Sequence, residues 1–483
     1  MRIKLLLLIF CSIIVLQGCS KKQGIEPSNI TPIAFSLSSV LQSNMVIQRD
    51  KPFTIWGTAK AADKVAINVS WNQTTFYSSA DPDGNWVLTI PATPVNSNPQ
   101  TVTAAIEGEI PIVLTNILIG DVWICSGQSN MVMPVDAISP FIGVANYQQE
   151  IANANYPQIR AFTAGVNSRV NISSTLLSGS KWDVCSPATV GAISAVSYFF
   201  ARKLNTELNI PIGIIIASVN NSICEQWMNS AAFQSDLTLP ALYAINSGEY
   251  YNGMIAPLIN LSVKGFIWYQ GESNENEPAI YPKLNSALIN GWRAVFKQGA
   301  LPFYYVQVAP FDATGNNDAT LDNVAVFREE QALIRGNVTN SGMAVTMDVG
   351  EIHNHHPQNK KPVGERLALL ALKNDYNKNI IANGPTYASF TVNNNTATLS
   401  FINGTADGLT TIGNAPLNQY FFVEGTDQVL RQGYATISGS HIIVTAPADT
   451  PLPIQAIRYA FTDFPITNIQ NSAGLPMEPF RTD

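Results

Sequence analysis

The chain has 483 residues, of which 46% are hydrophobic and 13% charged, with a formal net charge of −7. This much apolar material supplies several hydrophobic cores, so the composition excludes a disordered chain and indicates two or three domains. The acidic balance and the lack of any long lysine and arginine run exclude a surface built to attract nucleic acid.

Residues 1–18 are typical of a signal peptide. A basic start precedes the apolar run 5–16, which is too short to cross about 30 Å of hydrocarbon comfortably. The run ends in Leu16-Gln17-Gly18-Cys19, which resembles a bacterial lipobox. We therefore expect an exported bacterial lipoprotein, lipidated at Cys19, with residues 19–33 as a tether. It would meet the membrane through its lipid anchor only, facing the periplasm or at the cell surface. The alternative is an ordinary signal peptide with a chance cysteine.

Export leaves few cysteines for disulfide bonds. Once Cys11 is removed with the signal peptide and Cys19 is modified, Cys125, Cys185 and Cys224 remain. An odd number allows at most one disulfide. Their apolar neighbours favour a buried thiol for at least one of the three.

The two ends of the mature chain carry β patterns. In residues 34–116, short alternating runs such as 65–69 and 86–90 are separated by turns rich in Pro, Asp and Gly, which is typical of a small β-sandwich. Residues 383–483 repeat the pattern, which predicts a second all-β domain. Its alternating runs are 397–401, 419–423 and 441–444.

Residues 117–382 have an α/β pattern. Continuous apolar runs indicate buried parallel strands, and helix-period segments lie between or after them. We expect a doubly wound parallel sheet. The predicted strands are Val122–Cys125, Ile212–Ala217, Gly265–Tyr269, Phe303–Val308 and Met343–Met347. The predicted helices include Ala195–Leu208, Tyr281–Val295, Val324–Ile334 and Lys361–Ala371.

Reactive side chains follow four of these strands, at the edge where ligands bind in such sheets. A serine hydroxyl becomes a good nucleophile when an imidazole takes its proton, and the resulting oxyanion needs fixed N–H donors. The edge offers a serine, three of the four histidines in the chain, and several amides. Taken alone, the serine also fits a helix cap. The residues concerned are Ser129, Asn220, Asn221, Gln270, Glu272, Asp348, His353, His355 and His356.

The segment 120–131, Gly-Asp-Val-Trp-Ile-Cys-Ser-Gly-Gln-Ser-Asn-Met, resembles the nucleophile block of the sialate O-acetylesterase-like family of the SGNH hydrolase superfamily. Further matches follow in family order over most of the mature chain. The resemblance implies a three-layer SGNH-hydrolase (flavodoxin-like) parallel sheet, flanked by the two all-β domains. The further matching segments are 44–49, 211–215, 225–227, 268–274, 356–357 with Lys360, 364–368, 457–461 and 474–481.

The resemblance also implies the activity, a carbohydrate O-acetylesterase that removes acetyl esters from sialic acid or other glycans without a cofactor. Position by position, Ser129 would be the nucleophile and His356, the histidine before proline, the general base. The backbone N–H of Ser129 and the side-chain amide of Gln270 would donate to the oxyanion, and Glu272 would orient the site. The implied partner is an acetylated sugar or glycan.

The sequence departs from the family at two positions. Asn220-Asn221-Ser222 stands where the family has a Gly-Gly-Thr turn that supplies an oxyanion N–H. Asparagine tolerates the left-handed region, so we expect this donor to survive. The family's acid lies three residues before the histidine, a position that His353 occupies. Asp348, Glu351 or a main-chain carbonyl remain as candidates, and we favour Asp348 because it directly follows the last predicted strand.

The sequence also offers three alternatives to a serine esterase, namely a binding protein, a zinc site and a peptidase. The two departures fit a non-catalytic glycan-binding surface lipoprotein with a decayed core. The clustered histidines with Glu351 or Asp348 include enough ligands for zinc. However, loop spacings of one and two residues rarely aim three imidazoles at one ion, so we expect no metal. A peptidase lacks any supporting motif.

Overall fold

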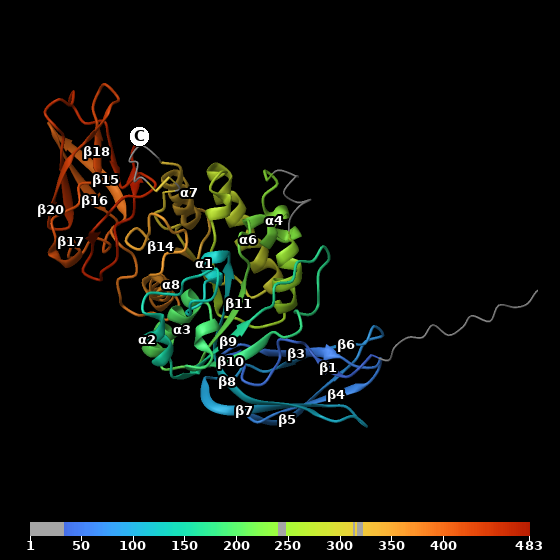
Figure 1. Cartoon of the computed structure of the whole chain (residues 1–483). Coiled ribbons are helices and arrows are strands. Elements are labelled where there is room, and N and C mark those ends of the chain that lie inside the picture. The colour runs from blue at the N-terminus through green and yellow to red at the C-terminus, as the bar shows by residue number, and fades with distance from the viewer. Residues whose placement is uncertain (1–32, 240–247, 313, 316–321) are drawn as a thin grey trace, which may run out of the picture.

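Figure 1 shows a blue β-rich N-terminal part, a central part with helices around a sheet, and an orange to red β-rich C-terminal part. This computed structural model of the chain describes residues 33–239, 248–312, 314–315 and 322–483. The expected signal peptide, the lipidation site Cys19 and nearly all of the tether lie outside the described residues. Within the described ranges the fold is mixed α/β with additional β sheets, which confirms this part of the prediction.

The N-terminal part contains two sheets whose inner faces share one core. One sheet has the order β1-β3-β6, and in the other β4 pairs with β5 and β7. In β4 and β6 buried and more exposed side chains alternate, as expected for strands with one face on a core. The strands are β1 (Ser36–Leu37), β2 (Val46–Gln48), β3 (Phe53–Thr58), β4 (Lys64–Val69), β5 (Asn72–Ser79), β6 (Asn85–Ile90) and β7 (Asn96–Ala105).

Strand β8 (Ile112–Gly127) joins this part to the central sheet. Its beginning pairs with β7, its middle with β2, and its end lies between two parallel strands of the central sheet. The boundary that we predicted between residues 116 and 117 therefore falls inside one strand. Asp121, in the middle of β8, accepts hydrogen bonds from Gln48 Nε2 at 2.7 Å and Arg49 Nε at 3.0 Å. These bonds fasten the N-terminal part to the sheet.

The central sheet has the order β10-β9-β11-β8-β12-β13-β14, in which all neighbours are parallel except the edge pair β10 and β9. The sequence did not predict β9, because Gln158 and Arg160 interrupt its apolar run. The last strand ends at Ala344 rather than Met347. The strands are β9 (Tyr156–Thr163), β10 (Lys181–Cys185), β11 (Ile212–Ser218), β12 (Gly265–Tyr269), β13 (Phe303–Val306) and β14 (Ser341–Ala344).

Helices cover both faces of this sheet, because successive side chains of the buried strands point to opposite sides. Trp123 belongs to a core with α3 and α8, whereas Ile124 belongs to a core with α6 and α7. The helices are α1 (Ser129–Val132), α2 (Tyr147–Ala152), α3 (Ala195–Leu208), α4 (Ser230–Ser235), α6 (Tyr281–Phe296), α7 (Asn323–Asn337) and α8 (Lys360–Asn374). Short 3-10 turns span Val190–Ala192, Cys224–Trp227, Ala256–Leu258, Glu272–Asn274, Pro278–Ile280 and Ile412–Asn414, and a π turn spans Tyr251–Ile255.

The C-terminal part is built from β strands, as the alternating runs predicted. Two four-stranded sheets have the orders β15-β16-β21-β20 and β19-β18-β22-β24, and β17 pairs with β23. The strands are β15 (Tyr387–Asn393), β16 (Thr396–Phe401), β17 (Thr410–Thr411), β18 (Phe421–Glu424), β19 (Leu430–Gln432), β20 (Tyr434–Ser438), β21 (His441–Thr445), β22 (Ala456–Tyr459), β23 (Ile469–Gln470) and β24 (Phe480–Arg481).

One expectation from the sequence concerns the cysteines. Cys125, Cys185 and Cys224 are buried free thiols, as their apolar neighbours indicated for at least one of them. Among the described residues, none of the helices is both long enough and apolar enough to span a bilayer.

Candidate active site

Ser129 is placed by a sharp turn between β8 and α1. Gly127 ends the strand with φ of 139°, and a Cβ atom there would lie 2.1 Å from the carbonyl oxygen of Tyr269. Only glycine fits so close to the neighbouring strand. Gln128 N–H then donates to the same carbonyl at 2.9 Å, and the helix begins at Ser129. The turn thus presents the serine at the carboxyl edge of the sheet.

The Ser129 side chain is almost buried, at 5% exposure. Its hydroxyl makes no hydrogen bond to another described residue, and the backbone N–H groups of Ser129 and Asn130 have no acceptor among them. Free N–H groups at the first turn of a helix point away from its body and attract negative charge. The turn therefore offers a nucleophile and two oxyanion donors in one place.

His356 is the half-buried member of the histidine cluster, whereas His353 and His355 are exposed. Its ring meets Phe141 edge to face, with ring centroids 5.1 Å apart. Burial, followed by the positive charges of Lys360 and His355, lowers the pKa of His356 to about 4. The imidazole is consequently unprotonated at neutral pH, the state that a general base requires.

Asn130 links the serine turn to the histidine loop. Its side-chain amide donates to Glu272 Oε1 at 2.5 Å and to the carbonyl oxygen of His355 at 2.9 Å. Its Oδ1 atom accepts from Lys360 Nζ at 2.6 Å. A single side chain next to Ser129 therefore fixes three segments of the site.

Asp348, our favoured orienting acid, is paired with Arg366 instead. The two side chains form a bidentate ion pair at 2.6 and 2.7 Å. Our argument from sequence placed Asp348 directly after a strand, but β14 ends four residues earlier and Asp348 lies in a turn. Among the described residues no hydrogen bond joins Asp348 and His356, so the geometry does not support the role that we assigned.

Glu351, the other acidic candidate, braces the histidine loop. Its Oε1 atom accepts from Gln358 N–H at 2.6 Å, and its Oε2 atom accepts from Asn354 Nδ2 at 2.9 Å. Within the described part of the chain, no carboxylate is hydrogen-bonded to the His356 ring.

Gln270, predicted to face the oxyanion, is completely buried and its amide is already engaged. Nε2 contacts Asn274 Oδ1 at 2.7 Å, Gln128 Oε1 at 3.2 Å and the Ser222 carbonyl at 3.3 Å. Its Oε1 atom accepts from the hydroxyl of Tyr281 at 2.9 Å. The structure thus places Gln270 beneath the site, where it ties together the loops after β8, β11 and β12.

Asn220 and Asn221 lie on the exposed loop after β11. Asn221 has φ of 57°, so the asparagine does adopt the left-handed conformation that the glycine-rich turn of the family suggested. Glu272 sits behind Asn130, and burial raises the pKa of its carboxyl group. Its Oε2 atom is buried and has no hydrogen-bond partner among the described residues. Glu272 thus holds the side chain of Asn130.

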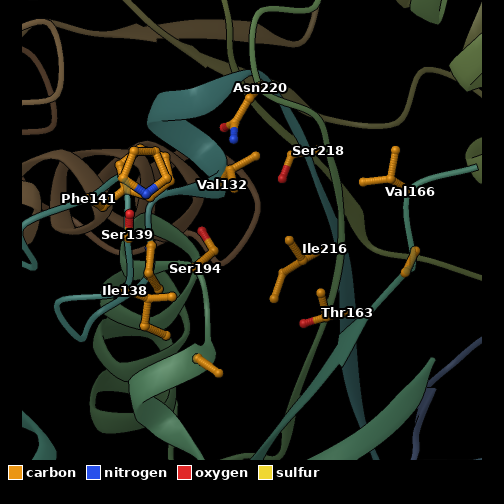
Figure 2. A pocket seen from close by; sticks show the side chains of 14 residues that line it. Val132, Ile138, Ser139, Phe141, Thr163, Val166, Ser194, Ile216, Ser218 and Asn220 are labelled. Atoms are coloured by element: carbon orange, nitrogen blue, oxygen red, sulfur yellow. The ribbon is translucent and has the colours of Figure 1, made fainter. Parts of the chain in front are cut away.

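A cavity of about 300 Å³ opens beside the serine turn. Figure 2 shows Val132 of α1, Phe141, and the β11 side chains Ile216 and Ser218 around it, with Asn220 near its upper edge. Val132 of α1 and Phe141, which contacts His356, line the cavity, whereas Ser129 and His356 themselves do not. None of the residues that line it is charged.

Sequence reasoning missed Asn130, Phe141 and the contact of Lys360 with Asn130. The first and last stand inside the matching motifs, so a polar residue next to the nucleophile and a lysine four residues after the histidine were visible signals. Phe141 carries no such signal. No group of three His, Cys, Asp or Glu side chains that could hold a metal ion occurs in the described ranges.

Known proteins resemble this chain in sequence and in fold. A family model described as carbohydrate esterase, sialic acid-specific acetylesterase, matches residues 119–373. Human sialate O-acetylesterase is 27% identical over 399 residues, covering 73% of each chain, and the rat protein is 26% identical over 423 residues, covering 73% of this chain and 76% of its own. The crystal structure of a carbohydrate acetylesterase from Xanthomonas citri has 32% identity and a TM-score of 0.83, over 93% of this chain and 99% of that one.

The matches include the serine turn, the loops after β11 and β12, and the histidine loop within one continuous span. They confirm the resemblance that the motif around Ser129 indicated, and with it a carbohydrate O-acetylesterase. The chain belongs to the carbohydrate esterase family of sialic acid-specific acetylesterases.

Proposed function

We propose that Ser129 and His356 hydrolyse O-acetyl esters of an uncharged sugar through an acetyl-enzyme. Ser129 Oγ passes its proton to His356 and attacks the acetyl carbonyl carbon. The oxyanion then meets the backbone N–H groups of Ser129 and Asn130. His356 returns the proton to the sugar oxygen, the C–O bond breaks, and water activated by His356 releases acetate.

The single observation that carries this mechanism is the serine turn. It combines an almost buried hydroxyl with two backbone N–H groups that have no acceptor among the described residues. Donors fixed before the reaction stabilise the developing charge without reorganising, which is the largest effect in many hydrolases. A decayed core would have no reason to retain this arrangement.

The cavity supports an uncharged sugar rather than a sialic acid. A sialic acid carries a carboxylate, and a buried carboxylate needs a cation or several donors to offset its lost hydration. The lining combines apolar side chains with the hydroxyls of Ser139, Thr163, Ser194 and Ser218, without a lysine or arginine. Such a surface suits the apolar faces and hydroxyl groups of a neutral sugar.

Acetate release from a panel of substrates tests the proposal. We expect faster release from acetylated neutral polysaccharides, such as acetylated xylan, than from 9-O-acetyl sialic acid. Ser129→Ala should abolish release from both. A clear preference for the sialic acid would overturn the uncharged-sugar assignment, and equal p-nitrophenyl acetate hydrolysis by wild type and Ser129→Ala would overturn the mechanism.

The same proposal includes the three-layer SGNH arrangement and a lipid anchor. The two cores, one on each face of the central sheet, support the first. The lipobox-like segment ending at Cys19 supports the second. Cys19→Ser should move the protein from the membrane fraction to the soluble fraction. Unchanged membrane association of that variant would contradict lipidation at Cys19.

A further inference from the structure

Lys360 is a buried cation that the proposed mechanism does not use. The side chain has 0% exposure and stands at the first position of α8. Two physical effects oppose a positive charge there, because burial removes its hydration and the N-terminus of a helix already carries partial positive charge. A position that keeps a cation against both effects calls for an explanation.

The interactions of Lys360 involve the serine turn, the end of β12 and the histidine loop. Nζ donates to Asn130 Oδ1 of α1 at 2.6 Å and lies 5.6 Å from the ring centroid of Tyr269 at the end of β12. Two carboxylates attract it, Glu272 after β12 and Glu351 in the histidine loop. The lysine thus faces the serine turn on one side and the histidine loop on the other.

We propose that Lys360 is a positioning residue for the esterase, which locks the Ser129 turn to the His356 loop through Asn130 and opposes a second positive charge on the His356 ring. The inference rests on the proposed roles of Ser129 and His356. The lock consists of the Lys360–Asn130 bond and the bond from Asn130 to the His355 carbonyl. The electrostatic part follows from the same two bonds, which tie Lys360 Nζ through Asn130 to the residue next to His356 in a poorly hydrated site.

The charges around His356 agree with this assignment. Besides burial, Lys360 and His355 lower the pKa of His356, and Phe141 adds an uncharged aromatic wall. Burial also lowers the pKa of Lys360 to about 7, opposed by Glu272 and Glu351. Below that value Lys360 is charged, so it disfavours protonation of His356 in the range where a histidine would otherwise gain its proton.

Three substitutions separate the bond from the charge. Lys360→Met removes both, Lys360→Gln removes the charge but keeps a donor, and Lys360→Arg keeps the charge in a different shape. We expect the acidic limb of the kcat/KM profile to move up by roughly one pH unit in the Met and Gln variants, and to stay in place in the Arg variant. Lys361→Met is the matched control, because the neighbouring Lys361 is exposed.

A second readout does not depend on catalysis. With only four histidines in the chain, the Cε1–H resonance of His356 can be assigned by comparison with a His356→Asn variant. Its titration by NMR should move upward by the same amount in Lys360→Met and not in Lys361→Met. If the Met variant does not fold, the Gln variant carries the comparison.

The outcomes are distinct. A rate reduced by the same factor at every pH, with an unmoved His356 titration, would overturn the electrostatic role and leave Lys360 as a structural residue. Unchanged rates and titration in folded neutral variants would overturn the whole inference. Failure of the proposed function would be seen elsewhere, as undiminished hydrolysis in Ser129→Ala, while the NMR titration still reports on Lys360 and His356.

Discussion

Arg366 of α8 binds both carboxylate oxygens of Asp348, through Nη1 at 2.7 Å and Nη2 at 2.6 Å. The same guanidinium donates to the carbonyl oxygen of Val345 at 2.8 Å. Arg366 therefore fastens the turn after β14 to the helix that begins with Lys360. The acid that the sequence favoured for catalysis acts in the structure as an anchor between these two elements.

Asp348→Asn tests this anchor. Loss of one charge-assisted hydrogen bond should lower the free energy of unfolding by about 1.5 to 3 kcal/mol, measured by urea denaturation. We expect kcat to fall less than tenfold, with Glu351→Gln as the comparison. A loss of about 10⁴ in kcat, with the fold intact, would instead restore Asp348 as the group that orients His356.

Ser129→Ala should reduce kcat by at least about 10³, as in other hydrolases that lose their nucleophile. Its circular dichroism and melting temperature should match the wild type, since the hydroxyl makes no hydrogen bond within the described structure. Ser126→Ala is the matched control. Ser126 belongs to the same motif and is fully buried without a hydrogen-bond partner for its hydroxyl among the described residues. Equal losses in the two variants would contradict the assignment.

His356 should give the enzyme an acidic limb at unusually low pH. Because the pKa of this imidazole is lowered to about 4, the ring stays neutral above that value, and kcat/KM should fall about tenfold per pH unit only below it. His356→Ala should remove most activity, whereas His355→Ala should change it little. A larger loss of activity in His355→Ala than in His356→Ala would show that His355, and not His356, is the general base.

The same shift affects folding. An unfolded chain protonates this histidine near pH 6.5, while the folded state resists protonation until about pH 4. The unfolded state therefore binds more protons between these values, and stability falls as the pH decreases through that range. Urea midpoints measured at several pH values should fall less steeply in His356→Asn. An unchanged slope would contradict the lowered pKa.

Gln270→Ala should act mainly on stability. The substitution removes one hydrogen bond from each of Gln128 Oε1, Asn274 Oδ1 and the Tyr281 hydroxyl, at roughly 0.5 to 1.5 kcal/mol per bond, because each group keeps another partner. We expect a lower melting temperature and a modest change in kcat per folded molecule. A stable variant with kcat reduced by about 10² to 10³ would show that the Gln270 amide serves the oxyanion after all.

Val166→Trp tests whether the cavity binds the sugar. Val166 lines the cavity and is 58% exposed, so a larger ring can narrow the opening without disturbing a core. We expect KM for an acetylated polysaccharide to rise about tenfold, equivalent to about 1.4 kcal/mol, with p-nitrophenyl acetate unaffected. Val170→Trp, at a position 94% exposed and outside this cavity, is the control. An equal change of KM in Val166→Trp and Val170→Trp would show that the sugar binds outside this cavity.

The sequence by itself determined most of the central strands and helices, but not β9 and β10. The strand Gly265–Tyr269 and the helix Ala195–Leu208 were predicted with the observed bounds. A strand buried on both faces gives a continuous apolar run, and a helix buried on one face gives a helical period. It also determined which residues meet at the carboxyl edge, since parallel strands end on the same side. Strand ends pointed to Ser129 and the histidine cluster 353–356, and the family motif singled out His356 within that cluster.

Only the tertiary structure decided which side chains pair with which. Periodicity does not reveal that Arg366, eighteen residues further on, takes both oxygens of Asp348, or that Gln270 turns its amide beneath the site. Nor does it show that β8 continues from the N-terminal part into the central sheet, or that β9 crosses the interior with Arg160 buried. A hydrogen bond forms only when donor and acceptor lie within a few tenths of an ångström of their ideal distance. For segments far apart in the chain, the packing of whole helices and strands sets that distance, and a local sequence pattern does not encode it.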